Sequence, residues 1–309
     1  MKTNRTLNWQ GVMPAVTTQF NAQGAVDIEA FAENLTFQKK AGVHGFILGG
    51  TLGEASTLTA TEKTDLLHTA KRIADKAIPV VMNIAEQSTQ EALAAATLAE
   101  QEGADGLMLL PPMRYKATDQ ETVSYFAEIA QHTSLPIMIY NNPVDYKIEV
   151  TLEMFDQLQA FQNIEAVKES TRDTTNITRM RNRFGDRFQI LCGVDTLAME
   201  SLVMGADGWV AGLVDAYPEE TVAIYAYCKA GHYAEARAIF RWFLPLLELD
   251  ISPQLVQNIK LCEVATGLGT GYVRPPRQPL SGLEKERVQQ IIDQAMASRP
   301  DVAAYKKLL

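Results

Sequence analysis

The chain has 309 residues, of which 47% are hydrophobic, and a formal net charge of −9 with a pI near 5.1. This length can bury a full core, and α/β barrels of this size form a single domain. The acidic balance argues against nucleic-acid binding, because binding a polyanion requires clustered positive charge. No stretch approaches the roughly 18 apolar residues of a membrane span. The first residues precede no apolar segment typical of a signal peptide.

The cysteines and histidines follow no metal-binding or triad pattern. Cys192, Cys228 and Cys262 lie far apart and in no CxxC spacing, which is typical of reduced thiols in a cytoplasmic protein. The four histidines share no cluster, which argues against a zinc site and against a Ser-His-Asp triad. We therefore expect a cytoplasmic protein without a metal site.

Short apolar runs alternate along the chain with segments of helical spacing. Most runs are apolar at successive positions, as in parallel strands that are buried on both faces. Between them lie amphipathic segments with helical spacing. Ile28–Lys40 is one of them, and Gly42 shortly after it suits a helix C-cap. A capping-box pattern at Thr59 predicts the start of another helix. The predicted strands are Gly11–Val16, Gly45–Leu48, Pro79–Met82, Gly106–Leu110, Pro136–Tyr140, Ile164–Val167, Phe188–Leu191 and Gly208–Val210.

The alternation predicts a closed (β/α)8 TIM barrel. A doubly wound open sheet is the alternative, but no GxGxxG turn follows the first strand. Beyond Gly212 no further strand is predicted, and the remaining segments are helical. We therefore expect a barrel domain over residues 1–219 and a C-terminal helical extension over 220–309. Its predicted helices are Glu219–Lys229, Tyr233–Leu247, Val256–Thr266 and Glu284–Ala297.

The residues at the carboxyl ends of the predicted strands carry the candidate chemistry, because active sites of such barrels lie there. They include no histidine and no paired acids, which leaves Lys168 as the nucleophile and Tyr140 as the proton carrier. A barrel mouth of low dielectric disfavours the ammonium form, so that a neutral amine can attack a ketone and form an imine. The alternatives are a solvated strand-end lysine and a tyrosine that only packs.

The turn Gly50-Thr51-Leu52-Gly53 is a candidate anion cradle. Its backbone N–H groups could hold a substrate carboxylate, with the Thr51 hydroxyl as a further donor, although an ordinary βα turn shows the same glycines. Asp195 either contacts the substrate or caps the helix that follows it. Val210, at the end of the last apolar run, is a further substrate-binding candidate.

Together, these motifs resemble the dihydrodipicolinate synthase / N-acetylneuraminate lyase family over essentially the whole chain. The motifs are Gly50 to Glu54, Tyr140-Asn141-Asn142-Pro143, Val167 to Thr171, Gly193-Val194-Asp195 and Gly205 to Gly208. The resemblance implies a (β/α)8 barrel with a C-terminal extension, a homotetramer built as a dimer of dimers, and Schiff-base catalysis without a cofactor. It matches Lys168 to the imine-forming lysine, Tyr140 and Thr51 to the proton relay, and the Thr51-Leu52 turn to the carboxylate cradle.

Three positions depart from the synthase pattern. Synthases carry a second threonine where this chain has Leu52, and an arginine for the aldehyde's carboxylate where it has Asp145. An acid there would repel an anionic aldehyde. Where synthases place a relay tyrosine that crosses the dimer interface, this chain has Arg114, with Tyr115 one position later. These departures argue against synthase activity, and the first turn and this loop also differ from sialic-acid lyases.

The motifs resemble most closely the 1-pyrroline-4-hydroxy-2-carboxylate deaminases of hydroxyproline degradation. This branch implies a cyclic imino acid or 2-oxo acid as the substrate, with Arg114 and Tyr115 near its distal groups and Asn142 or Asp145 near the ring nitrogen. Two alternatives remain open. One is another lyase, aldolase or dehydratase of the family, acting on a 2-keto-3-deoxy sugar acid, and the other is a non-catalytic 2-oxo acid sensor.

Overall fold

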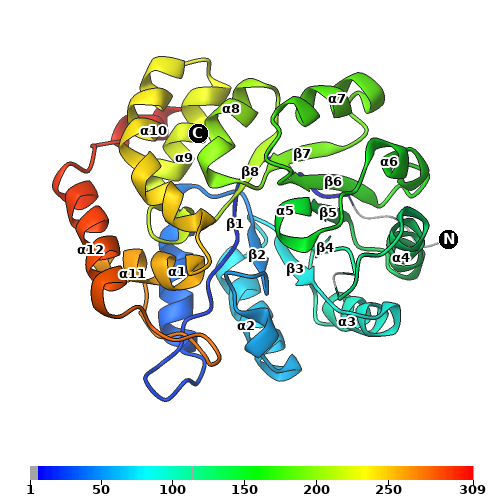
Figure 1. Ribbon diagram of the computed structural model, residues 1–309, viewed down its shortest axis with the longest axis horizontal. Coiled ribbons are helices and arrows are strands. Elements are labelled where there is room, and N and C mark those ends of the chain that lie inside the picture. Colours follow the sequence, from blue (N-terminus) through cyan, green and yellow to red (C-terminus); the bar gives the residue numbers. More distant parts are fainter. Residues whose placement is uncertain (1–5, 113, 309) are drawn as a thin grey trace.

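The computed structural model describes residues 6–112 and 114–308 (Figure 1). Eight parallel strands form one sheet in the order β1-β8-β7-β6-β5-β4-β3-β2. A parallel bridge between Ala15 and Ile47 joins the two edges and closes the sheet. The predicted (β/α)8 barrel is therefore confirmed. Its strands are β1 (Gly11–Pro14), β2 (Phe46–Leu48), β3 (Val80–Ile84), β4 (Gly106–Leu109), β5 (Ile137–Asn141), β6 (Ile164–Glu169), β7 (Gln189–Cys192) and β8 (Gly208–Ala211).

The helices lie outside the strands and cover the barrel (Figure 1). The predicted caps are present: Gly42 ends the first helix with a left-handed φ of 91°, and Thr59 opens the second with a capping box. In the described ranges no helix is long and apolar enough to cross a membrane. The covering helices are α1 (Ile28–Ala41), α2 (Ala60–Ala74), α3 (Thr89–Gln101), α4 (Asp119–His132), α5 (Pro143–Tyr146), α6 (Leu152–Leu158), α7 (Thr175–Phe184), α8 (Ala198–Val203) and α9 (Pro218–Lys229).

The inside of the barrel is filled by the residues that alternate inward along each strand. Ala166 of β6, Leu191 of β7 and Val210 of β8 belong to one buried cluster with Trp9, which lies before β1. The Trp9 indole Nε1 donates to Glu165 Oε2 at 2.9 Å. Because side chains alternate with a period of two, the residues two positions further along each strand face the same interior at the carboxyl end. This rule brings Lys168, Tyr140, Gly193 and Gly212 to the barrel mouth.

The C-terminal segment adds three helices, α10 (Tyr233–Leu247), α11 (Leu255–Thr266) and α12 (Gly282–Ala297). The predicted boundary at residues 219 and 220 falls inside α9. This helix packs against α1, β1 and β8 and covers the barrel as the other outer helices do. We propose to place the boundary after α9.

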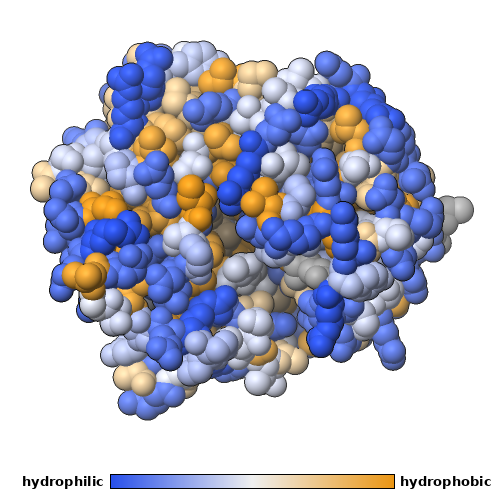
Figure 2. Space-filling model, viewed as in Figure 1, coloured by the Kyte–Doolittle hydropathy of each residue, from blue (hydrophilic) through white to orange (hydrophobic). Residues whose placement is uncertain are grey.

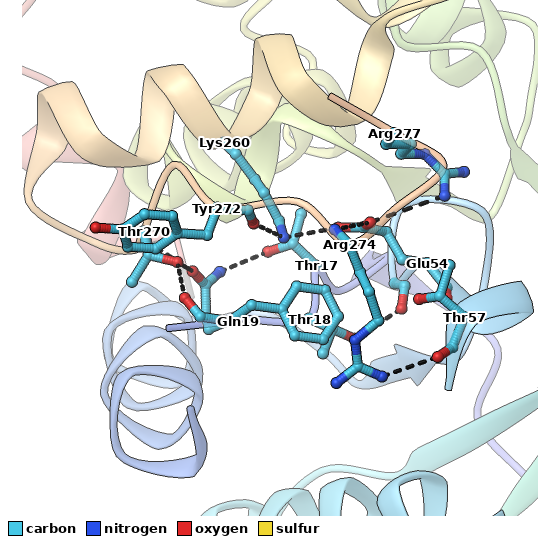
Figure 3. Close-up of polar contacts among 12 residues, drawn as sticks. Thr17, Thr18, Gln19, Glu54, Thr57, Lys260, Thr270, Tyr272, Arg274 and Arg277 are labelled. Carbon is cyan, nitrogen blue, oxygen red and sulfur yellow. Dashed lines mark hydrogen bonds and ion pairs between the residues drawn. The ribbon is translucent and has the colours of Figure 1, made fainter. Parts of the chain in front are cut away.

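A buried ion pair fastens the extension to the turn that follows β2 (Figure 3). The Lys260 ammonium of α11 donates to Glu54 Oε1 at 2.7 Å, and both side chains are fully buried. Lys260 also donates to the Tyr272 carbonyl at 2.6 Å, and the backbone N–H of Arg274 donates to Glu54 Oε2 at 3.0 Å. Glu54 directly follows the glycine turn, so the C-terminal segment holds the end of the candidate cradle.

A second set of contacts joins the same segment to the end of β1 (Figure 3). Gln19 donates from Nε2 to Glu263 Oε2 at 2.9 Å and accepts at Oε1 from the Thr270 N–H at 2.7 Å. The Lys260 Nζ lies 4.5 Å from the centroid of the Phe20 ring. The extension is thus part of the structure that shapes the barrel mouth.

We expect Lys260→Met to lower the free energy of unfolding by about 3–5 kcal/mol. The buried Glu54 carboxylate loses its partner at 2.7 Å, and the Arg277 guanidinium at 3.8 Å is too distant to replace it. Denaturant unfolding measures the change. The matched control is Lys306→Met, which removes an exposed ion pair with Glu219, and adding Glu54→Gln to Lys260→Met should recover part of the loss. Equal effects of Lys260→Met and Lys306→Met would contradict the buried clamp.

Candidate active site

Lys168 lies inside the barrel mouth, with 7% of its surface exposed. It is paired in register with Tyr140 of β5, and its Nζ lies 4.0 Å from the centroid of the Tyr140 ring. On the other side, a Cβ added to Gly193 would lie 2.6 Å from the Lys168 Cε and Cγ and 2.1 Å from the Ser170 Oγ. The position after β7 therefore has to be glycine for the lysine side chain to cross it.

Burial controls the charge of Lys168. It lowers the pKa of the amine, while the negative charges of Tyr146, Asp250, Asp195 and Cys192, where ionised, oppose this effect. In the described part of the chain no carboxylate forms an ion pair with Nζ. Burial thus increases the share of the neutral amine, which is the form that can attack a carbonyl carbon.

Tyr140 presents a buried, protonated phenol beside this amine. Its exposed fraction is 9%, and burial raises its pKa to about 12. The phenol oxygen accepts a hydrogen bond from Asn142 Nδ2 at 3.2 Å. Asn142 also caps α5 by accepting from the Asp145 N–H, and it donates to Asp145 Oδ2 at 2.7 Å. The predicted residues Lys168, Tyr140 and Asn142 are therefore brought together.

Tyr146 joins the site although the sequence did not indicate it. The one-turn helix α5 brings its ring edge-to-face against Tyr140, with centroids 5.4 Å apart. Its hydroxyl lies 3.0 Å from the Thr51 Oγ1. Thr51 is thus within hydrogen-bond distance of Tyr146, and the Tyr146 ring packs against the Tyr140 ring beside Lys168. The only signal in the sequence is a tyrosine shortly after the Tyr-Asn-Asn-Pro motif.

The turn after β2 has the free donors that an anion cradle needs. Gly50 and Thr51 use their carbonyls to accept from Ala55 and Glu54, at 3.3 and 3.1 Å. The N–H groups of Thr51 and Leu52 donate to no group in the part of the chain that the structure describes. Glu54 holds a left-handed φ of 51°, a conformation that is costly for a residue with a side chain. The strained turn therefore keeps two backbone donors available.

The Asp195 carboxylate accepts hydrogen bonds from groups in and directly after β8. It accepts from the Trp209 indole at 2.8 Å, and from the N–H groups of Gly212 at 3.1 Å and Leu213 at 2.9 Å. It makes no side-chain cap at the short helix that begins there, so the helix-capping alternative is wrong. Asp195 braces the ends of β7 and β8, and its substrate contact stays a prediction. Val210 lies in the buried interior layer.

Arg114 and Tyr115 lie away from this group within the chain. Both side chains are exposed in the loop between β4 and α4, and Tyr115 interacts with Glu121. Met113 of the same motif lies outside the described residues. The substrate contacts of Arg114 and Tyr115 stay predictions.

Figure 2 shows a recess near the middle of the face on which Figure 1 draws the strands converging. A separate open cavity of about 840 Å³ lies on α1 and the end of α2, where Phe37, Lys40 and Arg72 are among its lining residues. It contains none of the candidate catalytic groups. In the described ranges no group of three or more His, Cys, Asp or Glu side chains is placed to hold a metal ion.

The chain is similar in sequence and in fold to known proteins of one family. The sequence model of the Dihydrodipicolinate synthetase family matches residues 8–295. A 4-hydroxy-tetrahydrodipicolinate synthase of Bartonella bacilliformis is 32% identical, over 93% of this chain and 97% of its own, and one of Exiguobacterium sibiricum is 30% identical, over 87% and 92%. The solved 4-hydroxy-tetrahydrodipicolinate synthase of Methylacidiphilum fumariolicum SolV superposes with a TM-score of 0.90 at 26% identity, over 97% and 99% of the two chains.

We expect Tyr146→Phe to slow imine formation with a 2-oxo acid about a hundredfold, the lower range for loss of a proton-transfer group, with little change in substrate affinity. The rate is measured by borohydride trapping of pyruvate and mass spectrometry. Tyr233→Phe, on an exposed residue at the start of α10, is the matched control. If Tyr146→Phe traps pyruvate at the unchanged rate, the phenol is only a packing group.

Proposed function

Because the chain belongs to the dihydrodipicolinate synthetase family of lyases, we propose that it acts on a 2-oxo acid or cyclic imino acid through an imine on Lys168. The observation that carries the proposal is the buried, unpaired amine of Lys168 between the Tyr140 ring and Gly193. A pure sensor of 2-oxo acids would not require a lysine whose pKa is lowered by burial.

In the proposed first half-reaction, the Thr51 and Leu52 N–H groups hold the substrate carboxylate. Lys168 attacks the adjacent carbon, and a carbinolamine forms. The phenol of Tyr140 returns a proton to the departing oxygen, and Thr51 with Tyr146 passes protons between this phenol and the surface, where the Thr51 side chain is exposed. The resulting cationic imine draws electrons from the neighbouring carbon and makes its protons acidic.

We further propose that the substrate is 1-pyrroline-4-hydroxy-2-carboxylate. Lys168 adds to C2 and displaces the ring nitrogen as a tethered amine, the imine acidifies C3, and the 4-hydroxyl leaves as water. Migration of the double bond gives an imine at C5. Hydrolysis of both imines consumes two waters and releases ammonia and 2,5-dioxopentanoate, so the net reaction consumes one water.

The Asp145 carboxylate supports this substrate over one that carries a second carboxylate. Asp145 stands directly after the Tyr-Asn-Asn-Pro-Val segment, and its carboxylate lies beside Asn142 and 4.0 Å from Arg172. A carboxylate at this place attracts a displaced ammonium and repels a second substrate carboxylate. The second candidate is 4-hydroxy-tetrahydrodipicolinate synthase activity, which the names of the similar proteins favour.

We also propose a homotetramer in the cytoplasm. Exposed apolar side chains such as Tyr115, Val264 and Leu283 are available for contacts between subunits. Cys192, Cys228 and Cys262 are all free and buried, which fits a reducing compartment.

We expect the purified protein to turn over 1-pyrroline-4-hydroxy-2-carboxylate, and Lys168→Ala to abolish turnover because the nucleophile is removed. A coupled aldehyde dehydrogenase reports the semialdehyde product as NADPH. Lys306→Ala, on an exposed lysine of the last 3-10 turn that pairs with Glu219, is the matched control and should stay active.

The same preparation is assayed for condensation of pyruvate with the aldehyde substrate of the synthases. Condensation without pyrroline turnover would contradict the proposed substrate and support the second candidate. Absence of both activities, together with absence of a borohydride-trapped pyruvate adduct, would contradict an imine-forming function.

A further inference from the structure

The C-terminal extension contributes an acidic side chain to the barrel mouth. Asp250 lies in the short 3-10 turn Glu248–Ile251, between α10 and α11. A Cβ added to Gly212 would lie 2.9 Å from Asp250 Oδ1 and 3.0 Å from Leu52 Cδ1. Gly212 follows the end of β8 and Leu52 belongs to the anion cradle, so the Asp250 carboxyl group reaches the site from outside the barrel.

Asp250 and Asp195 both lie beside Gly212, but they differ in their hydrogen-bond partners. Asp195 is satisfied by the N–H groups of Gly212 and Leu213 and by the Trp209 indole. Asp250 accepts no hydrogen bond from the described residues and forms no ion pair with them. One carboxyl group is therefore fixed by the scaffold, and the other is available to the reaction.

The charge of Lys168 depends on this free carboxyl group. The charged groups that shift the pKa of Asp250 are Asp195, Lys168, Asp145 and Arg172. Those that shift the pKa of Lys168 are Tyr146, Asp250, Asp195 and Cys192. Asp145 and Arg172 are largely exposed, whereas Asp250 faces the interior. Among the carboxyl groups that affect the pKa of Lys168, Asp250 is thus the one that faces Gly212 at the barrel mouth and has no hydrogen-bond or ion-pair partner among the described residues.

We propose that Asp250 is the counter-ion of the cationic imine that forms on Lys168 and the source of the extra proton with which the carbonyl oxygen leaves as water. The proposal rests on the proposed imine chemistry and applies to any 2-oxo acid. It assigns the C-terminal extension a part in catalysis beyond fastening the cradle.

The proton balance of imine formation supports this assignment. A neutral amine, a ketone and one proton give a protonated imine and one water. The nitrogen–carbon bond forms as the carbonyl oxygen takes a proton, and the oxygen then leaves as water when the C=N bond forms. If the carboxylic acid of Asp250 supplies the extra proton, the neutral pair of Lys168 and Asp250 becomes a cation and an anion, and the net charge of the site is unchanged.

The electrostatic shifts agree with a pair that shares one proton. Burial lowers the pKa of Lys168 and raises the pKa of Asp250, since both charged forms lose hydration. Each group, when charged, opposes the shift of the other. Formation of the imine fixes a positive charge on the nitrogen and thereby stabilises the Asp250 carboxylate.

We expect Asp250→Asn to reduce pyruvate imine formation about tenfold or more, the effect of removing one opposite charge from a site of low dielectric. Asp250→Glu should restore most of the rate. Adducts are trapped with borohydride across a pH series and mapped to Lys168 by mass spectrometry. The control is Glu248→Gln, an exposed residue of the same turn, which should behave as the wild type.

The pH profile separates catalysis from folding, because its shape does not depend on the fraction of active protein. Removing the anion should shift the Lys168 titration to lower pH, since the carboxylate favours the ammonium. An unchanged rate and profile in Asp250→Asn would overturn the proposal, as would equal losses in the Asn and Glu variants. Trapping in the wild type tests the imine function separately, so the two failures are distinguishable.

Discussion

The site depends on one constraint, the burial of the Lys168 amine without an ion-pair partner. Because β6 alternates its side chains, the lysine two positions after Ala166 must enter the barrel mouth, and Gly193 leaves the space in which it lies. Desolvation then lowers the pKa of the amine. The surrounding residues hold this amine in a buried position beside the Tyr140 ring and Gly193.

Around this amine, each neighbouring strand end supplies a different function. The turn after β2 offers two free N–H groups, β5 supplies the Tyr140 phenol, and α5 returns Tyr146 to Thr51. The extension holds the first of these by the Lys260–Glu54 ion pair and brings Asp250 to the mouth. The C-terminal helices therefore contribute contacts and a carboxyl group to the barrel mouth.

The fold could be predicted from the sequence. Buried parallel strands carry apolar side chains on both faces, and capping residues such as Thr59 and Gly42 mark the ends of helices. The positions of Lys168 and Tyr140 could also be predicted, because both residues lie at strand ends and side chains alternate along a strand with a period of two. Tyr146 and Asp250 could not be found in this way. Their positions depend on a one-turn helix and on the return of a distant segment, which no local pattern encodes.

The most direct test of this account is the titration of Lys168 itself. Acetic anhydride labelling over a pH series, followed by peptide mass spectrometry, measures the fraction of neutral amine against a lysine peptide added as an internal reference. The account predicts that Lys168 titrates below the ordinary lysine value of 10.5. Titration at or above that value would contradict the claim that burial in the barrel lowers the pKa of this amine.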